Sequence, residues 1–162
     1  METRHLTTSD RKIFDEFNGV ILDALKNKEW FIPFDKDDPV LEESHDYFIG
    51  YFDGDKLAAI SALIFVEHFL GELREITGLG GKKIAEVGGS MVLPEYRGQN
   101  LMLQLNRKLV SYARDKGYEY LVATVHPDNV ASRTSAETLG FKLHSRFMRK
   151  GRFLRNLYVM KL

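Results

Sequence analysis

The sequence contains no cysteine and carries no net charge. The absence of cysteine excludes disulfides, thiolate catalysis and cysteine-ligated zinc, and it fits a reducing compartment such as the cytoplasm. The 23 basic residues equal the 23 acidic residues in number, so no overall field draws the chain to nucleic acid or to an anionic membrane. We therefore expect neither nucleic acid nor a membrane among its partners.

Long hydrophobic runs are also absent. The longest apolar stretch, Leu57–Val66, is interrupted by Ser61 and is too short to cross a bilayer, and the first residues lack the apolar core of a signal peptide. No histidine pair, acidic loop or glycine-rich loop has the spacing of a zinc site, an EF-hand or a P-loop, so we expect no metal. The length of 162 residues suits one domain, residues 1–162, which we expect to be cytoplasmic.

The first half of the chain predicts two helices and three strands. A strand at Arg4–Thr7 should precede a helix capped by Thr8, Ser9 or Asp10. The apolar face of that helix would consist of Ile13, Phe17, Val20, Ile21 and Ala24. The Asp38-Pro39 pair is typical of a helix start and predicts a short second helix that ends at Glu43.

Strands are expected next at Tyr47–Phe52 and Lys56–Phe69, joined by a hairpin at Asp53-Gly54. The segment Leu70–Lys83 is rich in glycine and charge, and we interpret it as a mobile connection. At the other end of the chain, Lys142–Met148 and Leu154–Lys161 predict a closing hairpin around Lys150-Gly151.

The most informative segment lies between these two parts. An apolar strand from Ala85 ends at Pro94, a short polar loop follows, and an amphipathic helix runs from Leu101 to about Gly117. The first turn of a helix has main-chain N–H groups without partners and the positive end of the helix dipole, so this order of elements predicts an anion site. A second strand, Tyr120–Val125, should lie parallel to the first.

The loop Arg97-Gly98-Gln99-Asn100-Leu101-Met102 resembles the R/Q-x-x-G-x-G/A motif of the GNAT superfamily of acyl-CoA-dependent N-acetyltransferases. Asn100 replaces a usual glycine, but asparagine tolerates positive φ, so the turn can form. Met102 replaces a usual glycine or alanine, and its side chain should point away from the cofactor. Asn129 and Gly140-Phe141 stand where the family opens and closes its next helix, predicted here from Val130 to Leu139.

The resemblance implies an α/β (α+β) fold with a mixed central sheet of about seven strands and about four helices, in which diverging parallel strands form the acyl-CoA cleft. It implies that acetyl-CoA contacts Met91, Val92, Leu93, Arg97, Gly98, Gln99, Asn100, Leu101, Met102, Asn129 and Ser132. Gly88 and Gly89 indicate either a β-bulge in the cofactor strand or relief of crowding under a helix.

Acyl transfer from a thioester to an amine needs a base, a donor to the carbonyl oxygen and a route for a proton to the leaving thiolate. A main-chain N–H near Ser90 or Met91 could be the donor. Glu86, just before the paired glycines, is the first candidate for the base, and His126, after the next strand, is the second. Many family members have a tyrosine acid where this chain has Ala136, and Tyr158 is a candidate substitute.

The function implied by the resemblance is N-acyl transfer, with an acetyl group passing from acetyl-CoA to a primary amine of a small molecule or peptide by direct attack in a ternary complex. The alternative is a non-catalytic sensor or scaffold that holds acyl-CoA, which the departures at Asn100, Met102 and Ala136 motivate. Either protein could be a monomer or a homodimer.

Two groups of residues give opposite indications about the acceptor. One group would favour a cationic amine, and it comprises Trp30, Phe31, Phe34, Asp35, Asp37 and Asp38. The other would favour an anionic acceptor or an acidic partner, and it comprises Arg146, Arg149, Lys150, Arg152 and Arg155. The sequence leaves both possibilities open.

Overall fold

Seven strands form one mixed sheet in the computed structural model, which describes residues 1–162. The strands are β1 (Glu2–Leu6), β2 (Asp46–Asp53), β3 (Lys56–Ile64), β4 (Ile84–Val92), β5 (Tyr120–Val125), β6 (Lys142–Arg149) and β7 (Phe153–Lys161). Their order across the sheet is β1-β2-β3-β4-β5-β7-β6, and only β4 and β5 are parallel neighbours. This arrangement confirms the predicted fold class, including the hairpins at Asp53-Gly54 and Lys150-Gly151.

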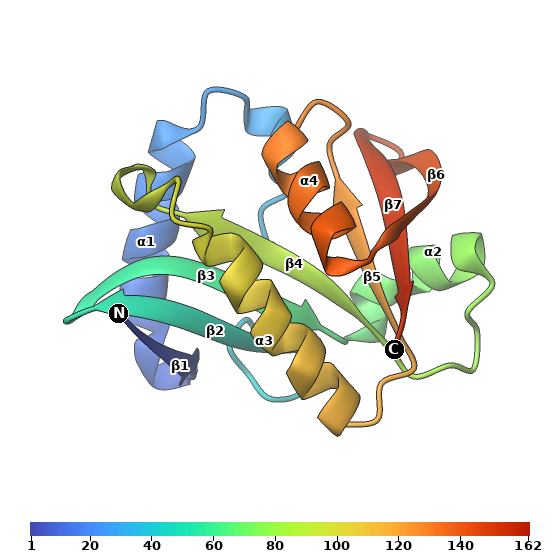
Figure 1. Cartoon of the computed structure of the whole chain (residues 1–162), viewed down its shortest axis with the longest axis horizontal. Helices are drawn as coiled ribbons and strands as arrows, with labels where there is room; N and C mark the ends of the chain where they lie inside the picture. Colours follow the sequence, from blue (N-terminus) through green and yellow to red (C-terminus); the bar gives the residue numbers. More distant parts are fainter.

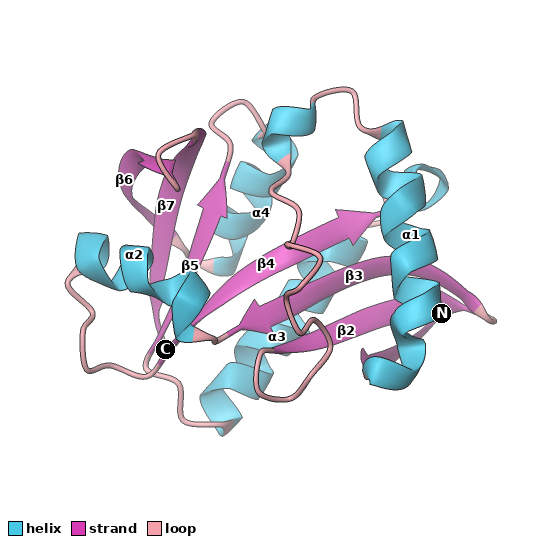
Figure 2. Cartoon of the chain, turned by 180° about the vertical axis from the view of Figure 1, so that it is seen from behind, coloured by secondary structure: helices cyan, strands magenta, loops and turns pink.

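Four α-helices cover the two faces of the sheet. They are α1 (Arg11–Ala24), α2 (Glu67–Thr77), α3 (Leu101–Asp115) and α4 (Val130–Leu139). Helices α3 and α4 lie on the face seen in Figure 1, and α1 and α2 lie on the opposite face (Figure 2). Three short 3-10 turns, Thr8–Asp10, Lys28–Trp30 and Pro94–Tyr96, complete the regular structure.

Alternating side chains on the strands fill a separate core on each face. On β5, Leu121 and Ala123 join the cluster beneath α3 and α4, whereas Val122 between them packs with Leu73 of α2. The same period of two sends neighbouring residues of β7 to opposite faces, since Tyr158 joins the first cluster and Leu157 the second. Any side chain of these strands can therefore be assigned to a face by counting.

Strands β4 and β5 remain paired over a short distance only. Their register covers three residues of each strand, from Ile84 opposite Tyr120 to Glu86 opposite Val122. Strand β4 then continues to Val92 without a neighbour on that side, so its main chain is free to pair with another group there. The separation of these strands is the feature of the fold that creates the candidate site.

A β-bulge lies on β4 where the two strands separate. Gly89 and Ser90 together face Ser61 of β3, because the register shifts by one residue between Ile60 and Ala62. Gly89 has φ +60, and a Cβ there would lie 3.0 Å from a ring carbon of Phe48. The bulge interpretation of the paired glycines is thus confirmed, and close packing beneath Gly89 adds to it.

The helix α2 corrects the sequence prediction for this part of the chain. Strand β3 ends at Ile64 rather than Phe69, and the expected mobile connection holds most of a helix. Leu70 and Leu73, one helical turn apart, are fully buried against the sheet. The Arg74 side chain donates to the carboxylate of Glu67 and to the carbonyls of Leu79 and Lys82. The last two hydrogen bonds hold the glycine-containing segment that follows α2.

Two other predictions about helices were wrong. Residues 39–43 form turns rather than a short helix, and Leu41 adopts φ +73, which a right-handed helix does not allow. On α1 the buried residues are Phe14, Phe17 and Ile21, and the predicted face included Val20 and Ala24, which are exposed. Phe17 and Ile21 of the predicted face are buried as expected, so this prediction was wrong only in omitting Phe14 and in including Val20 and Ala24.

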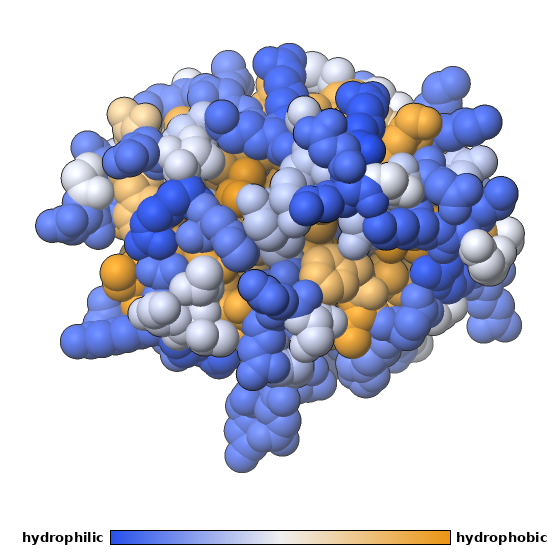
Figure 3. Space-filling view, turned by 90° about the horizontal axis from the view of Figure 1, so that it is seen from below, coloured by the Kyte–Doolittle hydropathy of each residue, from blue (hydrophilic) through white to orange (hydrophobic).

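No helix of this fold is long and apolar enough to cross a bilayer. The face seen in Figure 3 is mainly hydrophilic, with small apolar areas between charged side chains. Scattered apolar surface of this kind is ordinary for a folded chain and indicates no docking site on that face.

Candidate active site

A cleft opens where β4 and β5 separate, and residues from both faces of the sheet line it. Those on the side of α3 and α4 are Met102, Asn106, Asn129, Ser132, Ser135, Ala136, Leu139 and Phe141. Those on the side of α1 and α2 are Trp30, Phe31, Ile32, Phe34, Ile64, Phe69, Arg149, Lys150 and Arg155. Glu86, the bulge and Thr124 lie between the two groups, so the cleft connects the faces through the sheet.

The N-terminus of α3 has the features of an anion site. Gln104 makes the first main-chain hydrogen bond of the helix, to the carbonyl of Asn100, and the N–H groups of residues 98–103 have no partner in the chain. Gly98 adopts φ +82 and Asn100 φ +58, so Asn100 takes the conformation for which the family uses glycine. Arg97, Gly98, Gln99 and Asn100 are exposed, whereas Leu101 is buried in the core below.

Side chains from β2 and β3 hold this loop in position. Lys56 forms a 2.7 Å ion pair with Glu95, and the Tyr96 hydroxyl donates to Asp53 at 2.7 Å. At the start of the helix, Gln104 donates to the carbonyl of Gln99 and accepts from the hydroxyl of Tyr51. These contacts join segments far apart in the sequence and fix the loop before any ligand binds.

The N-terminus of α4 lies on the same side of the cleft. The Asn129 Oδ1 accepts from the Ser132 N–H at 3.2 Å, so the predicted N-cap is confirmed. The Met102 sulfur lies 4.0 Å from the Ser132 Oγ and Met102 lines the cleft, so its side chain does not point away from the cleft as expected. The unbranched thioether fits here because it can change conformation when a ligand enters.

The remaining predicted cofactor residues lie at the end of β4. Met91 faces Ile60 and Val92 faces Ala59 in the ladder with β3, and the N–H of Leu93 donates to the carbonyl of Ala58. Their main chain is therefore bound on the β3 side. The side that faces β5 has no strand beside it.

Glu86 lies deep in the cleft and forms an ion pair with Arg149. The guanidinium donates to Oε2 at 2.5 Å and to Oε1 at 2.8 Å, and both side chains are at least nine-tenths buried. Thr124 joins them, donating to Glu86 and accepting from Arg149. Burial opposes the charge of Arg149, but the Glu86 carboxylate outweighs it and holds the pKa of Arg149 above its ordinary value.

Of the other two catalytic candidates, His126 lines the cleft and Tyr158 does not. His126 lines the cleft, stacks on Trp30 with ring centroids 6.1 Å apart, and accepts from the Asp128 N–H through Nδ1. In the neutral ring the proton is then assigned to Nε2, so Nε2 is a hydrogen-bond donor. Tyr158 is 1% exposed, its hydroxyl lies 3.5 Å from Glu137, and it does not line the cleft.

The two opposing groups of acceptor residues are also separated. Trp30, Phe31 and Phe34 line the cleft on the α1–α2 side, and Figure 2 shows their loop crossing that face. Asp35, Asp37 and Asp38 do not line it, whereas three basic residues of the final hairpin do. These are Arg149, Lys150 and Arg155.

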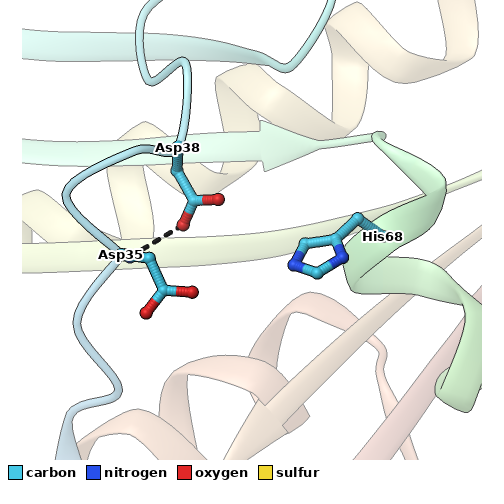
Figure 4. A group of neighbouring side chains, drawn as sticks. All are labelled: Asp35, Asp38 and His68. Atoms are coloured by element: carbon cyan, nitrogen blue, oxygen red, sulfur yellow. Dashed lines mark hydrogen bonds between the residues drawn. The ribbon is translucent and has the colours of Figure 1, made fainter.

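Asp35 and Asp38 lie instead beside His68 of α2, with the potential ligand atoms all within 4.8 Å of one another (Figure 4). The Asp38 carboxylate accepts from the main-chain N–H of Asp35 at 2.7 Å, which closes a turn of the loop. This hydrogen bond accounts for the closeness of the two aspartates, and Asp35 and His68 are exposed, so the cluster by itself supports no metal site. The expectation of a metal-free protein stays a prediction.

Three polar residues of the cleft were missed by the sequence reasoning. Asn106 of α3 accepts from the hydroxyl of Ser61 at 2.6 Å, and Ser61 also contacts Ser90 of the bulge. The Ser135 Oγ is buried in the cleft without a partner, next to Ala136. Thr124 is the third, and only its place near the end of an apolar strand pointed to it.

Comparison with solved structures shows that the fold is shared with acetyltransferases. An N-acetyltransferase from Staphylococcus aureus Mu50 superposes with a TM-score of 0.71 at 15% identity, covering 99% of this chain and 96% of the other. NAA60 of Arabidopsis thaliana, solved with a bisubstrate analogue, gives 0.74 at 16% identity, covering 99% and 97%. The ribosomal-protein-S18-alanine N-acetyltransferase from Escherichia coli gives 0.70 at 17%, covering 99% and 92%.

No curated protein matches the sequence. The sequence model of the acetyltransferase (GNAT) family, whose members use acetyl-CoA, does match, and it covers residues 11–141. That range includes the loop at the N-terminus of α3, the bulge and both cleft helices. The chain therefore belongs to the GNAT family of acetyltransferases.

Proposed function

We propose that this chain transfers an acetyl group from acetyl-CoA directly to a primary amine of a small molecule or peptide within a ternary complex. The observation that carries the proposal is the unpaired N-terminus of α3 together with the cleft that crosses the sheet, which Met102 of the first helical turn lines. One side of the cleft can hold an anionic donor while the acceptor enters from the other. A protein built only to sense acyl-CoA would not need the half of the cleft on the side of α1 and α2.

For the donor, the free N–H groups from Gly98 to Met102 would bind the pyrophosphate, with Arg97 beside them. The unpaired edge of β4 at Met91, Val92 and Leu93 would pair with pantetheine, which carries amide groups of its own. Asn129 and Ser132 line the opposite wall. This assignment uses every cofactor residue that the family resemblance implies.

In the transfer, the amine nitrogen attacks the thioester carbonyl carbon, a C–N bond forms and the C–S bond breaks. The sulfur leaves as the CoA thiolate and takes up a proton, while the nitrogen loses one. A main-chain N–H of the bulge near Ser90 or Met91 would polarise the carbonyl oxygen. A thiolate is a good leaving group, so the absence of a tyrosine at Ala136 does not prevent the reaction.

We propose Glu86 as the group that receives the amine proton, directly or through a water, because it is the carboxylate that lines the cleft. Both of its oxygens already accept hydrogen bonds from Arg149. Proton uptake by Glu86 therefore has to weaken the ion pair with Arg149. Until then the ion pair holds the carboxylate in one position. His126 presents a donor and is better suited to hold a carbonyl or a water.

Release of free thiol from acetyl-CoA over a panel of amines, amino acids and peptides tests the function. The chain has no cysteine, so every thiol detected comes from CoA. We expect thiol release that depends on the amine and equals the amount of acetylated product. Tight CoA binding without amine-dependent release over the whole panel would instead support the sensor.

A further inference from the structure

Arg155 is a buried cation without a counterion in the chain. It is 2% exposed, and its guanidinium donates to two main-chain carbonyls, those of Leu154 and Glu29, at 2.7 Å each. It takes part in no salt bridge, and it lines the cleft. A buried charge is costly unless an opposite charge compensates it, so this guanidinium is prepared for an anion.

The strand pattern places Arg155 on the acceptor side. On β7, Arg155 has the same parity as Leu157, which packs against α2, and the opposite parity to Tyr158, which packs beneath α4. The anion loop of α3 belongs to the other face. Arg155 is therefore on the wrong side of the sheet to serve the pyrophosphate.

No carboxylate lies within ion-pair distance of Arg155. Glu86 is the carboxylate of the cleft, and Arg149 occupies both of its oxygens. Burial and the neighbouring charge of Arg149 lower the pKa of Arg155, and together they outweigh the charge of the exposed Glu29 side chain, which raises it. Lys150 adds another positive charge to the same wall, above the ring of Phe69 at 5.3 Å.

We propose that the acceptor is an amine that also carries a carboxylate, and that Arg155 binds this carboxylate. The inference rests on the proposed function and names the substrate class of its site. Trp30, Phe31 and Phe34 line the same half of the cleft, which favours an apolar group on the acceptor. Polyamines are disfavoured because they would bring further positive charge to Arg149, Lys150 and Arg155.

The test compares three acceptors of similar shape: phenylalanine, phenylalaninamide and phenethylamine. We expect kcat/KM for phenylalanine to exceed that of the other two by about tenfold or more, since a hydrogen bond between charged groups is worth at least that in binding. The preference should disappear in Arg155→Gln. It should persist in Arg152→Gln, a matched control in the same hairpin, because Arg152 is exposed and does not line the cleft.

Fluorescence gives a binding measurement that does not depend on turnover. Trp30 is the only tryptophan and lines the cleft, so its emission can report occupancy. Titration with unreactive 3-phenylpropionate should change the emission at concentrations about tenfold lower than 3-phenylpropylamine. This comparison uses the unsubstituted protein and holds even if Arg155→Gln does not fold.

The outcomes separate the two proposals. Failure to bind CoA or to release thiol, together with preferential 3-phenylpropionate binding, would reject the transferase and retain the carboxylate site. Turnover with equal or greater preference for phenethylamine would retain the transferase and overturn the carboxylate site. A preference for phenylalanine that survives unchanged in folded Arg155→Gln would also overturn the role of Arg155.

Discussion

At the scale of single residues, the ion pair between Glu86 and Arg149 links stability to chemistry. Removing one partner of a buried pair leaves the other charge uncompensated and costs about 3–5 kcal/mol. An activity loss in a variant of either residue is therefore informative only when the variant is shown to be folded. Thr124 forms hydrogen bonds with both side chains, so a variant of Thr124 also has to be shown to be folded before its activity is interpreted.

We predict that Glu86→Gln lowers kcat by about a hundredfold or more, because general-base catalysis contributes at least that much. The KM for acetyl-CoA should remain close to its original value, since the anion loop is untouched. Steady-state kinetics across pH, with unfolding measured on the same preparation, provides the check.

Glu75→Gln is the matched control for this substitution, because Glu75 is an exposed carboxylate on α2 outside the cleft. It should leave both kcat and stability unchanged. Normal turnover in folded Glu86→Gln would assign the proton to solvent or to His126 and leave Glu86 as the partner that positions Arg149.

At the scale of the elements, the N-cap of α4 links the stability of a helix to the candidate site, because Asn129 caps the helix and also lines the cleft. We predict that Asn129→Ala lowers the free energy of unfolding by about 1 kcal/mol, because α4 loses the acceptor for the Ser132 N–H. Asn129→Ser should restore most of that stability, since serine is also a good N-cap. Denaturant unfolding of the three proteins measures this effect.

CoA affinity of the same variants decides whether Asn129 also contacts the donor. We expect Asn129→Ala to weaken CoA binding as well as stability. An unchanged dissociation constant in this variant would leave the capping role alone.

The start of α1 predicts a dependence of stability on pH. Hydrogen bonds from Arg4, together with the Thr7 N–H, hold the pKa of Asp10 below its ordinary value, so its contribution is present above about pH 4 and is lost as pH falls through the lowered pKa. We predict that Asp10→Asn is about 1 kcal/mol less stable at pH 7, because a neutral amide has one acceptor oxygen and cannot replace the paired hydrogen bonds that the carboxylate accepts from Arg4. The difference should shrink towards pH 2 in urea titrations, and a constant difference would contradict the assignment.

The sequence predicted the elements whose signals are local. The order of strand, proline, loop and helix from Ala85 to Leu101 contains its own start and stop signals, and so does the cap at Asn129. The helix α2 was missed for two reasons. The apolar run of β3 continues through Val66 up to the first residue of the helix, and glycines follow the end of the helix. The predicted strand and the observed helix overlap only at residues 67–69, and over three residues the period of a strand cannot be distinguished from that of a helix.

The candidate site was predictable only in part for a different reason. Glu86 and Arg149 are 63 residues apart, and no local pattern shows that they pair. The same holds for the loop contacts of Tyr51 and Asp53, which depend on the sheet topology. Basic residues of the final hairpin were identifiable as a group, but only the folded hairpin, with the alternation of β6 and β7 and the turn at Lys150, shows which of them line the cleft.

At the scale of the whole molecule, binding at one loop should stabilise the entire fold. A ligand that binds only the folded state at a hundred times its dissociation constant adds about 2.7 kcal/mol to the free energy of unfolding. For a chain of this size that corresponds to a rise in Tm of about 5–10 °C. We predict a shift of this size with CoA, measured by thermal unfolding.

Gly98→Val should abolish most of that shift while leaving the unliganded protein folded. Gly98 adopts φ +82, which a β-branched residue avoids, but the position is exposed and a Cβ there would meet no atom within 4 Å. The loop would therefore change conformation without disturbing the core, and the N–H groups would no longer converge on a phosphate. Arg107→Ala, on the exposed face of α3, is the control and should retain the full shift. If CoA stabilised Gly98→Val as strongly as the unsubstituted protein, the pyrophosphate would have to bind elsewhere, and the assignment of residues 97–102 to the donor would be wrong.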